Sequence, residues 1–172
     1  MATEEIQRRL LAGIAEKLKD RHLTLCTAES CTGGLVGALC TSLPGSSAWY
    51  KGGIIAYDNE LKERLLGVPS GILRQYGAVS KASAGAMLSG ALRACSADCA
   101  IAITGIAGPD GGSAEKPVGF VVIGVAVPDK TAAHKEVIIS KTFSGDRAAN
   151  RLSAATKALQ MLDALVLNIV RT

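Results

Sequence analysis

The chain has 172 residues, a formal net charge of +4, 48% hydrophobic residues and 20% charged residues. This composition excludes intrinsic disorder, and the length predicts one domain over residues 1–172 with a single hydrophobic core. The basic residues are dispersed, without a basic run or interleaved aromatic residues, so the sequence does not indicate a nucleic-acid partner.

Hydrophobic periodicity predicts elements in the order α-β-α-β-α-α-β-β-β-α, with one further short helical turn. In chain order these are a helix over 4–19, a strand over 23–27, a helix from about 32 to the turn at 43–47, a strand over 54–57, a helix over 59–66, a short turn of helix over 72–76, a helix over 80–94, strands over 98–104, 120–127 and 136–143, and a helix that begins at 146. The last two strands are joined by the turn at 128–130, which is short enough for an antiparallel hairpin.

This order predicts an α/β fold in which helices cover both faces of a mixed, mostly parallel sheet of about five strands. The amphipathic N-terminal helix, within residues 1–20, is expected to pack one face against this core. In such sheets ligands bind at the carboxyl ends of the strands. Three segments should converge there: the turn at Ser30, the turn over 57–59 and the loop that follows Thr104.

The cysteines and histidines indicate the cellular compartment and whether a metal site is expected. The five cysteines form no CxxC pair, and several lie in apolar runs: Cys26, Cys31, Cys40, Cys95 and Cys99. This usage predicts reduced thiols and a cytoplasmic location. His22 and His134 have no metal-ligand spacing to Cys, Asp or Glu, so no metal site is expected. No stretch of about 18 uncharged apolar residues appears, so no membrane span is expected.

The turn after the first strand carries the most distinctive chemistry. Ser30 and Cys31 place two nucleophiles before Gly33 and Gly34, whose lack of side chains lets a ligand approach the backbone. A helix that starts near Thr32 would direct unpaired N–H groups and its positive dipole end into this turn, where they favour an anion or an oxyanion. The simpler alternative is that Ser30 or Thr32 caps the helix while the glycines allow close packing on the sheet.

A base for this turn has to come from elsewhere in the chain. A Ser-His-Asp triad is not expected, because both histidines are predicted at the opposite end of the sheet. Lys62 follows the second strand at the same end as Ser30, and a pKa about three units below the usual value of about 10.4 would let it act as a base near pH 7. An ordinary solvated lysine is the alternative. Chemistry alone does not choose between Ser30 and Cys31 as the nucleophile.

A Gly/Pro-rich loop over 105–119 is long enough to suggest a functional role. It matches neither a P-loop nor a GxGxxG fingerprint, so no nucleoside triphosphate or dinucleotide cofactor is indicated. Lys116 in this loop and Arg147 at the start of the last helix are candidate phosphate contacts. Ordinary surface charges are the alternative for both.

Several sequence blocks, taken together, resemble those of a known family. They read TAESCTGGLVG (27–37), LPGSSAWYKGGIIAYDNELKERLLGV (43–68), GAVS (77–80), TGIAGPDGG (104–112), KPVG (116–119) and SGDR (144–147). They resemble the C-terminal domain of the competence/damage-inducible protein CinA, whose standalone members are nicotinamide-nucleotide amidohydrolases. The resemblance implies a three-layer α/β/α sandwich. It also implies hydrolysis of the carboxamide of nicotinamide mononucleotide to nicotinate mononucleotide and ammonia, without a metal or other cofactor, in pyridine nucleotide recycling.

The family pattern also implies roles for individual residues. The serine of the ESCTGG block, here Ser30, is the expected nucleophile. The tyrosine and lysine of the YxNxxK block, here Tyr57 and Lys62, are expected to assist it. The usual block reads YSN, whereas this chain has Asp58. Its carboxylate would favour the charged form of Lys62, unless position 58 faces solvent.

Backbone N–H groups of the turn are expected to receive the oxyanion, and residues after the third strand are expected to shape the substrate pocket. The turn residues are Cys31, Thr32, Gly33 and Gly34, and the pocket residues are Thr104, Gly105 and Gly108. Lys116 or Arg147 would hold the phosphate of the mononucleotide.

The alternative function is a catalytically silent nucleotide-binding module that serves a partner protein. It follows from the same resemblance, because family members fused to a larger N-terminal domain need not all retain activity. The helix faces are rich in Ala and Gly, which permits close self-association, so a homo-oligomer, most simply a dimer, is expected.

Overall fold

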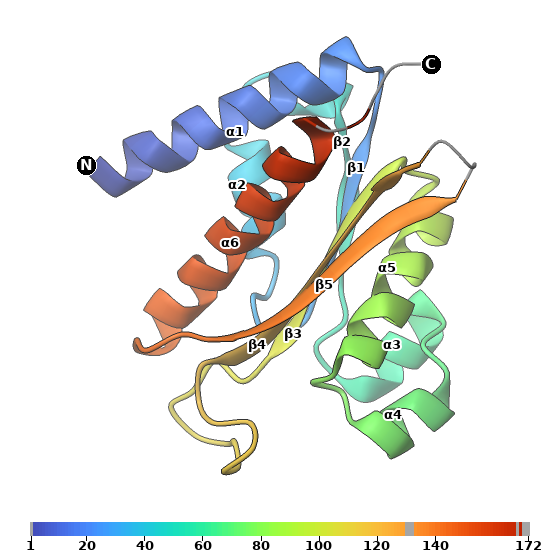
Figure 1. Cartoon of the computed structure of the whole chain (residues 1–172), viewed down its shortest axis with the longest axis vertical. Helices are drawn as coiled ribbons and strands as arrows, with labels where there is room; N and C mark the ends of the chain where they lie inside the picture. Colours follow the sequence, from blue (N-terminus) through green and yellow to red (C-terminus); the bar gives the residue numbers. More distant parts are fainter. Residues whose placement is uncertain (1, 130–132, 168, 170–172) are drawn as a thin grey trace.

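The computed structural model describes residues 2–129, 133–167 and 169, and its centre is a five-stranded sheet in the order β2-β1-β3-β4-β5 (Figure 1). The strands are β1 (Leu25–Glu29), β2 (Tyr50–Ile55), β3 (Cys99–Gly105), β4 (Phe120–Pro128) and β5 (His134–Thr142). β1 pairs in parallel with β2 and β3, whereas β4 pairs antiparallel with both β3 and β5. All strands except β4 therefore run in one direction, and the predicted mixed, mostly parallel sheet is confirmed.

Helices cover both faces of the sheet, as predicted (Figure 1). The helices of one face are α1 (Ala2–Asp20), α2 (Leu35–Thr41) and α6 (Arg147–Leu167), and those of the other are α3 (Asn59–Leu66), α4 (Ser70–Tyr76) and α5 (Lys81–Cys95). A short 3-10 helix, η1 (Ser46–Ala48), precedes β2. None of the helices in the described part of the chain combines the length and apolarity needed to cross a lipid bilayer.

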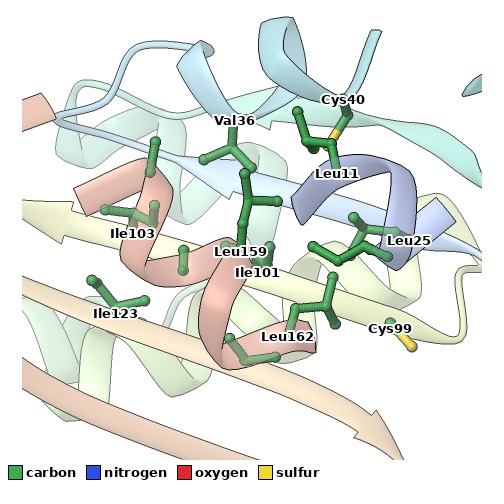
Figure 2. Packing of buried hydrophobic residues seen from close by; sticks show 14 of the residues in the cluster. Leu11, Leu25, Val36, Cys40, Cys99, Ile101, Ile103, Ile123, Leu159 and Leu162 are labelled. Carbon is green, nitrogen blue, oxygen red and sulfur yellow. The ribbon is translucent and has the colours of Figure 1, made fainter. Parts of the chain in front are cut away.

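Each face of the sheet has its own hydrophobic core. Under α1, α2 and α6, helix residues such as Leu11, Val36 and Leu159 pack on Leu25 and Ile101 of the strands (Figure 2). Under α3 and α5, the larger helix residues Leu66 and Met87 pack on small residues of β1 and β3, namely Cys26, Ala28, Ala100 and Ala102. Because side chains alternate along a strand, even-numbered residues of β1 and β3 face α5, and odd-numbered residues face α1 and α6.

Three predicted elements beside the cavity described below have wrong boundaries. The first strand, predicted over 23–27, spans Leu25–Glu29 as β1. The helix predicted from near Thr32 begins at Leu35, because Gly33 and Gly34 have φ values of 62° and 91° and form a turn instead. The strand predicted over 54–57 spans Tyr50–Ile55, since pairing with β1 extends it through residues that have low strand propensity.

The hairpin between β4 and β5 is confirmed as antiparallel, with the Asp129 N–H donating to the carbonyl of Ala133. Lys130 of the predicted turn lies outside the described residues, as do 1, 131, 132, 168 and 170–172. A single domain over the whole of 1–172 therefore stays a prediction.

Candidate active site

A cavity of about 280 Å³ opens where β1, β2 and β3 end. This volume is close to the lower end of the range of about 300–1,000 Å³ for small-molecule sites. Its lining residues come from segments far apart in the sequence: Ser30, Cys31, Tyr57, Asn59, Lys62, Ala78, Val79, Thr104 to Ala107, Asp110 to Gly112, and Arg147. The predicted convergence of three segments at the carboxyl ends of the strands is confirmed.

Ser30 continues the strand ladder for one residue beyond β1. Its N–H donates to the carbonyl of Ile103 at 2.9 Å, and the register that pairs Glu29 with Ile103 brings Ser30 beside Thr104. Both residues are even-numbered, so this register directs both toward the α5 face of the sheet. Ser30 is buried but lines the cavity, and no described residue forms a hydrogen bond with its hydroxyl.

Lys62 reaches the same cavity from α3. Its side chain is 1% exposed, and its Nζ donates to the backbone carbonyl of Tyr57 at 3.1 Å. Among the described residues, no carboxylate forms a salt bridge with it. Burial lowers the pKa of Lys62 from its usual value of 10.5, while the charges of Asp58 and Cys31 oppose that change. The alternative of an ordinary solvated lysine is therefore wrong, and the amine is easier to deprotonate than a surface lysine.

Asp58 is exposed and caps α3 rather than pairing with the lysine. Its carboxylate accepts the backbone N–H of Glu60 at 2.8 Å, and the first turn of the helix begins there. The expected effect of this carboxylate on Lys62 is present, since it raises the pKa, but burial has the larger influence.

Cys31 lines the cavity beside Ser30 and is buried. Burial raises the pKa of its thiol to about 11, so the neutral thiol predominates at neutral pH. Cys31 therefore lacks the thiolate character that a helix N-terminus would have favoured, and the choice of Ser30 as nucleophile rests on the family resemblance.

Tyr57 and Arg147 form one wall of the cavity. Arg147 donates from Nη2 to the hydroxyl of Tyr57 at 2.8 Å and from Nη1 to the carbonyl of Gly108 at 2.7 Å. The guanidinium thus connects the end of β2 with the loop after β3. Arg147 is exposed, so its positive charge is also available to a ligand in the cavity.

The N-terminus of α2 is occupied by a side chain of the protein itself. The carboxylate of Glu29 accepts the N–H groups of Gly34, Val36 and Gly37 at 3.0, 3.1 and 2.9 Å, and Glu29 is 1% exposed. The interpretation of this helix end as an open anion site is therefore wrong. The Gly33 N–H is also used, since it donates to the carbonyl of Ser30.

Residues of α6 fix the loops around the cavity. Arg151 donates from both Nε and Nη2 to the carbonyl of Thr32, at 3.2 and 2.7 Å. Asn150, fully buried, donates to the carbonyls of Ala107 and Gly145. The long C-terminal helix thus holds both the turn after β1 and the loop after β3.

The family model for the CinA C-terminal domain matches residues 7–166 of the chain. The chain belongs to the CinA C-terminal domain family. It is 48% identical over 149 residues to the nicotinamide-nucleotide amidohydrolase PncC of Escherichia coli K12, a match that covers 87% of this chain and 88% of that protein. It is 46% identical over 158 residues to the PncC of Enterobacter agglomerans, with 92% and 94% covered.

Solved structures of CinA proteins have the same fold. The competence damage-inducible protein A of Klebsiella pneumoniae superposes with a TM-score of 0.89 at 32% identity, covering 95% of this chain and 99% of the other. The competence/damage-inducible protein of Agrobacterium tumefaciens gives a TM-score of 0.85 at 39% identity, with 92% and 94% covered. The predicted family and three-layer architecture are thereby confirmed.

The CinA domain brings together only part of the predicted site. The predicted residues that line the cavity are Ser30, Cys31, Tyr57, Lys62, Thr104, Gly105 and Arg147, and those that do not are Thr32, Gly33, Gly34, Gly108 and Lys116. Lys116 lies apart because its Nζ donates to the carbonyl of Tyr76 at 3.5 Å. Gly108 contributes through its carbonyl, which accepts from Arg147.

The CinA domain also uses residues that the sequence analysis missed. Glu29, Asn150 and Arg151 hold the walls of the cavity, and Asn59 and Asp110 line it. Glu29 had a usable signal, since a glutamate at the end of a buried strand, directly before a Gly-rich turn, needs an internal partner. Arg151 had none, because its partner Thr32 is 119 residues away in the chain.

Proposed function

We propose that this CinA domain is a serine amidohydrolase that converts nicotinamide mononucleotide to nicotinate mononucleotide and ammonia. The names of its close relatives support the substrate class. The observation that carries the mechanism is that Ser30 and the buried Lys62, whose pKa is lowered, line one cavity at the end of the parallel strands.

The reaction begins with neutral Lys62. Its Nζ, held by the carbonyl of Tyr57, takes the proton of the Ser30 hydroxyl as that oxygen bonds to the carboxamide carbon. The proton then passes to the leaving nitrogen, the C–N bond breaks, and ammonia departs. Lys62 then takes a proton from a water molecule, whose oxygen attacks the ester carbon. The bond to Ser30 breaks, the serine regains its proton, and the carboxylate product is released.

The oxyanion is received by the N–H group of Cys31, the residue of this turn that lines the cavity next to Ser30. No backbone carbonyl of the described residues accepts a hydrogen bond from this N–H group, whereas the N–H groups of Gly33 and Gly34 are already used within the turn. Each donor of this type stabilises the transition state by about 3 kcal/mol. Arg147 supplies a positive charge at the cavity wall for the phosphate, whereas Lys116 is not among the lining residues and its Nζ donates to the carbonyl of Tyr76.

The test is the release of ammonia from nicotinamide mononucleotide. Ser30→Ala should lower kcat by at least about 10⁴-fold, whereas Cys31→Ala should retain most of the activity. Ser42→Ala serves as the matched control, because Ser42 is an exposed serine that donates to the carbonyl of Leu39 away from the cavity. Binding of the nucleotide without ammonia release by the parent would support the catalytically silent module instead.

We further propose that the domain acts as a homodimer in the cytoplasm. Light scattering of the purified protein tests the first statement, and fractionation of cells that express it tests the second. A monomer at assay concentration would contradict the proposed dimer.

A further inference from the structure

Thr104 lies beside the proposed nucleophile. It follows Ile103, whose carbonyl accepts the Ser30 N–H, and it is 1% exposed and lines the cavity. Nothing in the proposed reaction uses its hydroxyl. The hydroxyl nevertheless lies on the same face of the sheet as Ser30, within reach of a group bound to that serine.

The hydroxyl of Thr104 already donates its proton in a hydrogen bond within the protein. Thr104 donates from Oγ1 to the carbonyl of Ala78 at 2.9 Å, and a carbonyl oxygen can only accept. Ala78 also lines the cavity, so the hydrogen bond lies at the cavity wall. The hydroxyl has a single proton, and its remaining lone pairs can therefore only accept hydrogen bonds.

No described residue donates a hydrogen bond to Thr104 Oγ1. A buried acceptor at the wall of a site gains most from a ligand that brings a donor. The two atoms that flank the carboxamide carbon of the substrate differ in this respect, since the nitrogen carries two N–H groups and the oxygen carries none. We propose that Thr104 is a specificity-determining residue that accepts an N–H of the substrate carboxamide and thereby distinguishes the amide from the carboxylate product.

This inference rests on the proposed function and adds the basis of its selectivity. The product carboxylate has only acceptor oxygens, so one of them would lie against the lone pairs of Thr104 without a proton between them. The amide is thus bound more tightly than the acid. The same contact directs the nitrogen toward Thr104 and leaves the carbonyl oxygen for the N–H group of Cys31. After the C–N bond breaks, the repulsion favours release of the product.

The experiment measures the dissociation constants of nicotinamide mononucleotide and of nicotinate mononucleotide by calorimetry. All variants carry Ser30→Ala, so that the amide is not consumed. Thr104→Val keeps the shape of the side chain and removes the hydroxyl, and we expect it to weaken amide binding about tenfold while the acid binds equally or more tightly. Thr104→Ser keeps the hydroxyl and should restore the preference for the amide.

The matched control is Ser83→Ala, which also removes a buried hydroxyl that holds the segment lining the cavity. Ser83 donates to the carbonyl of Gly77 at 2.7 Å, but it does not line the cavity itself. Loss of this anchor should change the binding of amide and acid by the same factor. A merely structural role for Thr104 predicts the same result for Thr104→Val.

The outcomes separate the inference from the function on which it rests. An unchanged ratio of the two dissociation constants in Thr104→Val overturns the inference, whether both ligands bind less tightly or neither changes. Ammonia release by the parent tests the proposed function by itself. If it is absent, that function fails, while the binding constants measured in the Ser30→Ala background still decide whether Thr104 distinguishes the amide from the acid. If ammonia is released and the preference for the amide over the acid is lost only in Thr104→Val, both proposals are supported.

Discussion

Two buried ionisable side chains flank the proposed nucleophile, and their surroundings differ. Glu29 and Lys62 are both 1% exposed. Glu29 accepts three backbone N–H groups, whereas Lys62 donates to one backbone carbonyl and forms no salt bridge among the described residues. A buried charge with a full set of partners is stable and holds structure, while one with few partners favours its neutral form. Glu29 therefore stabilises the turn before α2, whereas Lys62 is suited to act as a base.

The two side chains also act on opposite faces of the sheet. Glu29 is an odd-numbered residue of β1 and caps α2, on the side of α1 and α6. Lys62 belongs to α3 on the other side, where Ser30 and Thr104 face. The Glu29 carboxylate thus holds the turn that follows Ser30 on one side of the sheet, and the Lys62 amine shares the cavity with Ser30 on the other. This separation predicts that substitutions of the two residues affect different properties.

The largest expected effect is on activity, from Lys62→Met. Loss of the base should lower kcat/KM for nicotinamide mononucleotide by about 10³-fold, since general bases typically contribute 10²–10⁴-fold. The free energy of unfolding should stay unchanged or rise, because methionine fills the space without a buried amine. Ammonia release and urea denaturation measure the two quantities.

The control for this substitution is Lys51→Met. Lys51 also donates to a backbone carbonyl, that of Ser96, but it is exposed and does not line the cavity. Its activity should equal that of the parent. Retention of activity within about tenfold by Lys62→Met would rule out this lysine as the base.

The next effect is on stability, from Glu29→Gln. The amide offers one acceptor oxygen and turns an N–H group toward backbone donors, so the free energy of unfolding should fall by about 2–4 kcal/mol. Glu5→Gln makes the same chemical change at an exposed ion pair with Arg9 and should cost less than about 1 kcal/mol. Equal losses in the two variants would show that the three N–H contacts contribute little.

A third test uses the pH dependence of both properties. Activity requires neutral Lys62, so kcat/KM should rise with pH through the pKa of Lys62 and level off below pH 10.5, the usual value for a lysine. Between the lowered pKa of Lys62 in the folded chain and about 10.5 in the unfolded chain, the unfolded chain binds more protons at this residue than the folded one. Stability should therefore also rise with pH in this window, and Lys62→Met should remove that slope. A level profile in the parent would contradict the assignment.

The sequence predicted the fold well because hydrophobic periodicity reports which residues are buried. The strand predicted over 98–104, for example, agrees with β3 (Cys99–Gly105) to within one residue, because its apolar residues are buried on both faces of the sheet. It predicted Ser30, Lys62 and Tyr57 through motif spacing and the family resemblance. It failed at the N-terminus of α2, because pattern analysis does not show that the side chain of Glu29 folds over its own turn. It also missed Arg151, since only tertiary structure brings α6 to Thr32.

The smallest expected effect comes from Asp58→Ser. This substitution removes a negative charge that stabilises the ammonium form of Lys62. Asp58 raises the pKa of Lys62, so its removal should move the midpoint of the kcat/KM profile to lower pH, and the shift should be small because the Asp58 carboxylate is exposed. Serine is also a good N-cap, so α3 should keep its stability within about 0.5 kcal/mol. Glu63→Gln is the matched control, because Glu63 is exposed on the same helix and is not among the groups that act on the pKa of Lys62. A midpoint that moves to higher pH in Asp58→Ser, or moves equally in Glu63→Gln, would mean that the titrating group is not Lys62. A shift confined to Asp58→Ser would assign the acidic limb of the profile to Lys62, the amine that lines the cavity with Ser30.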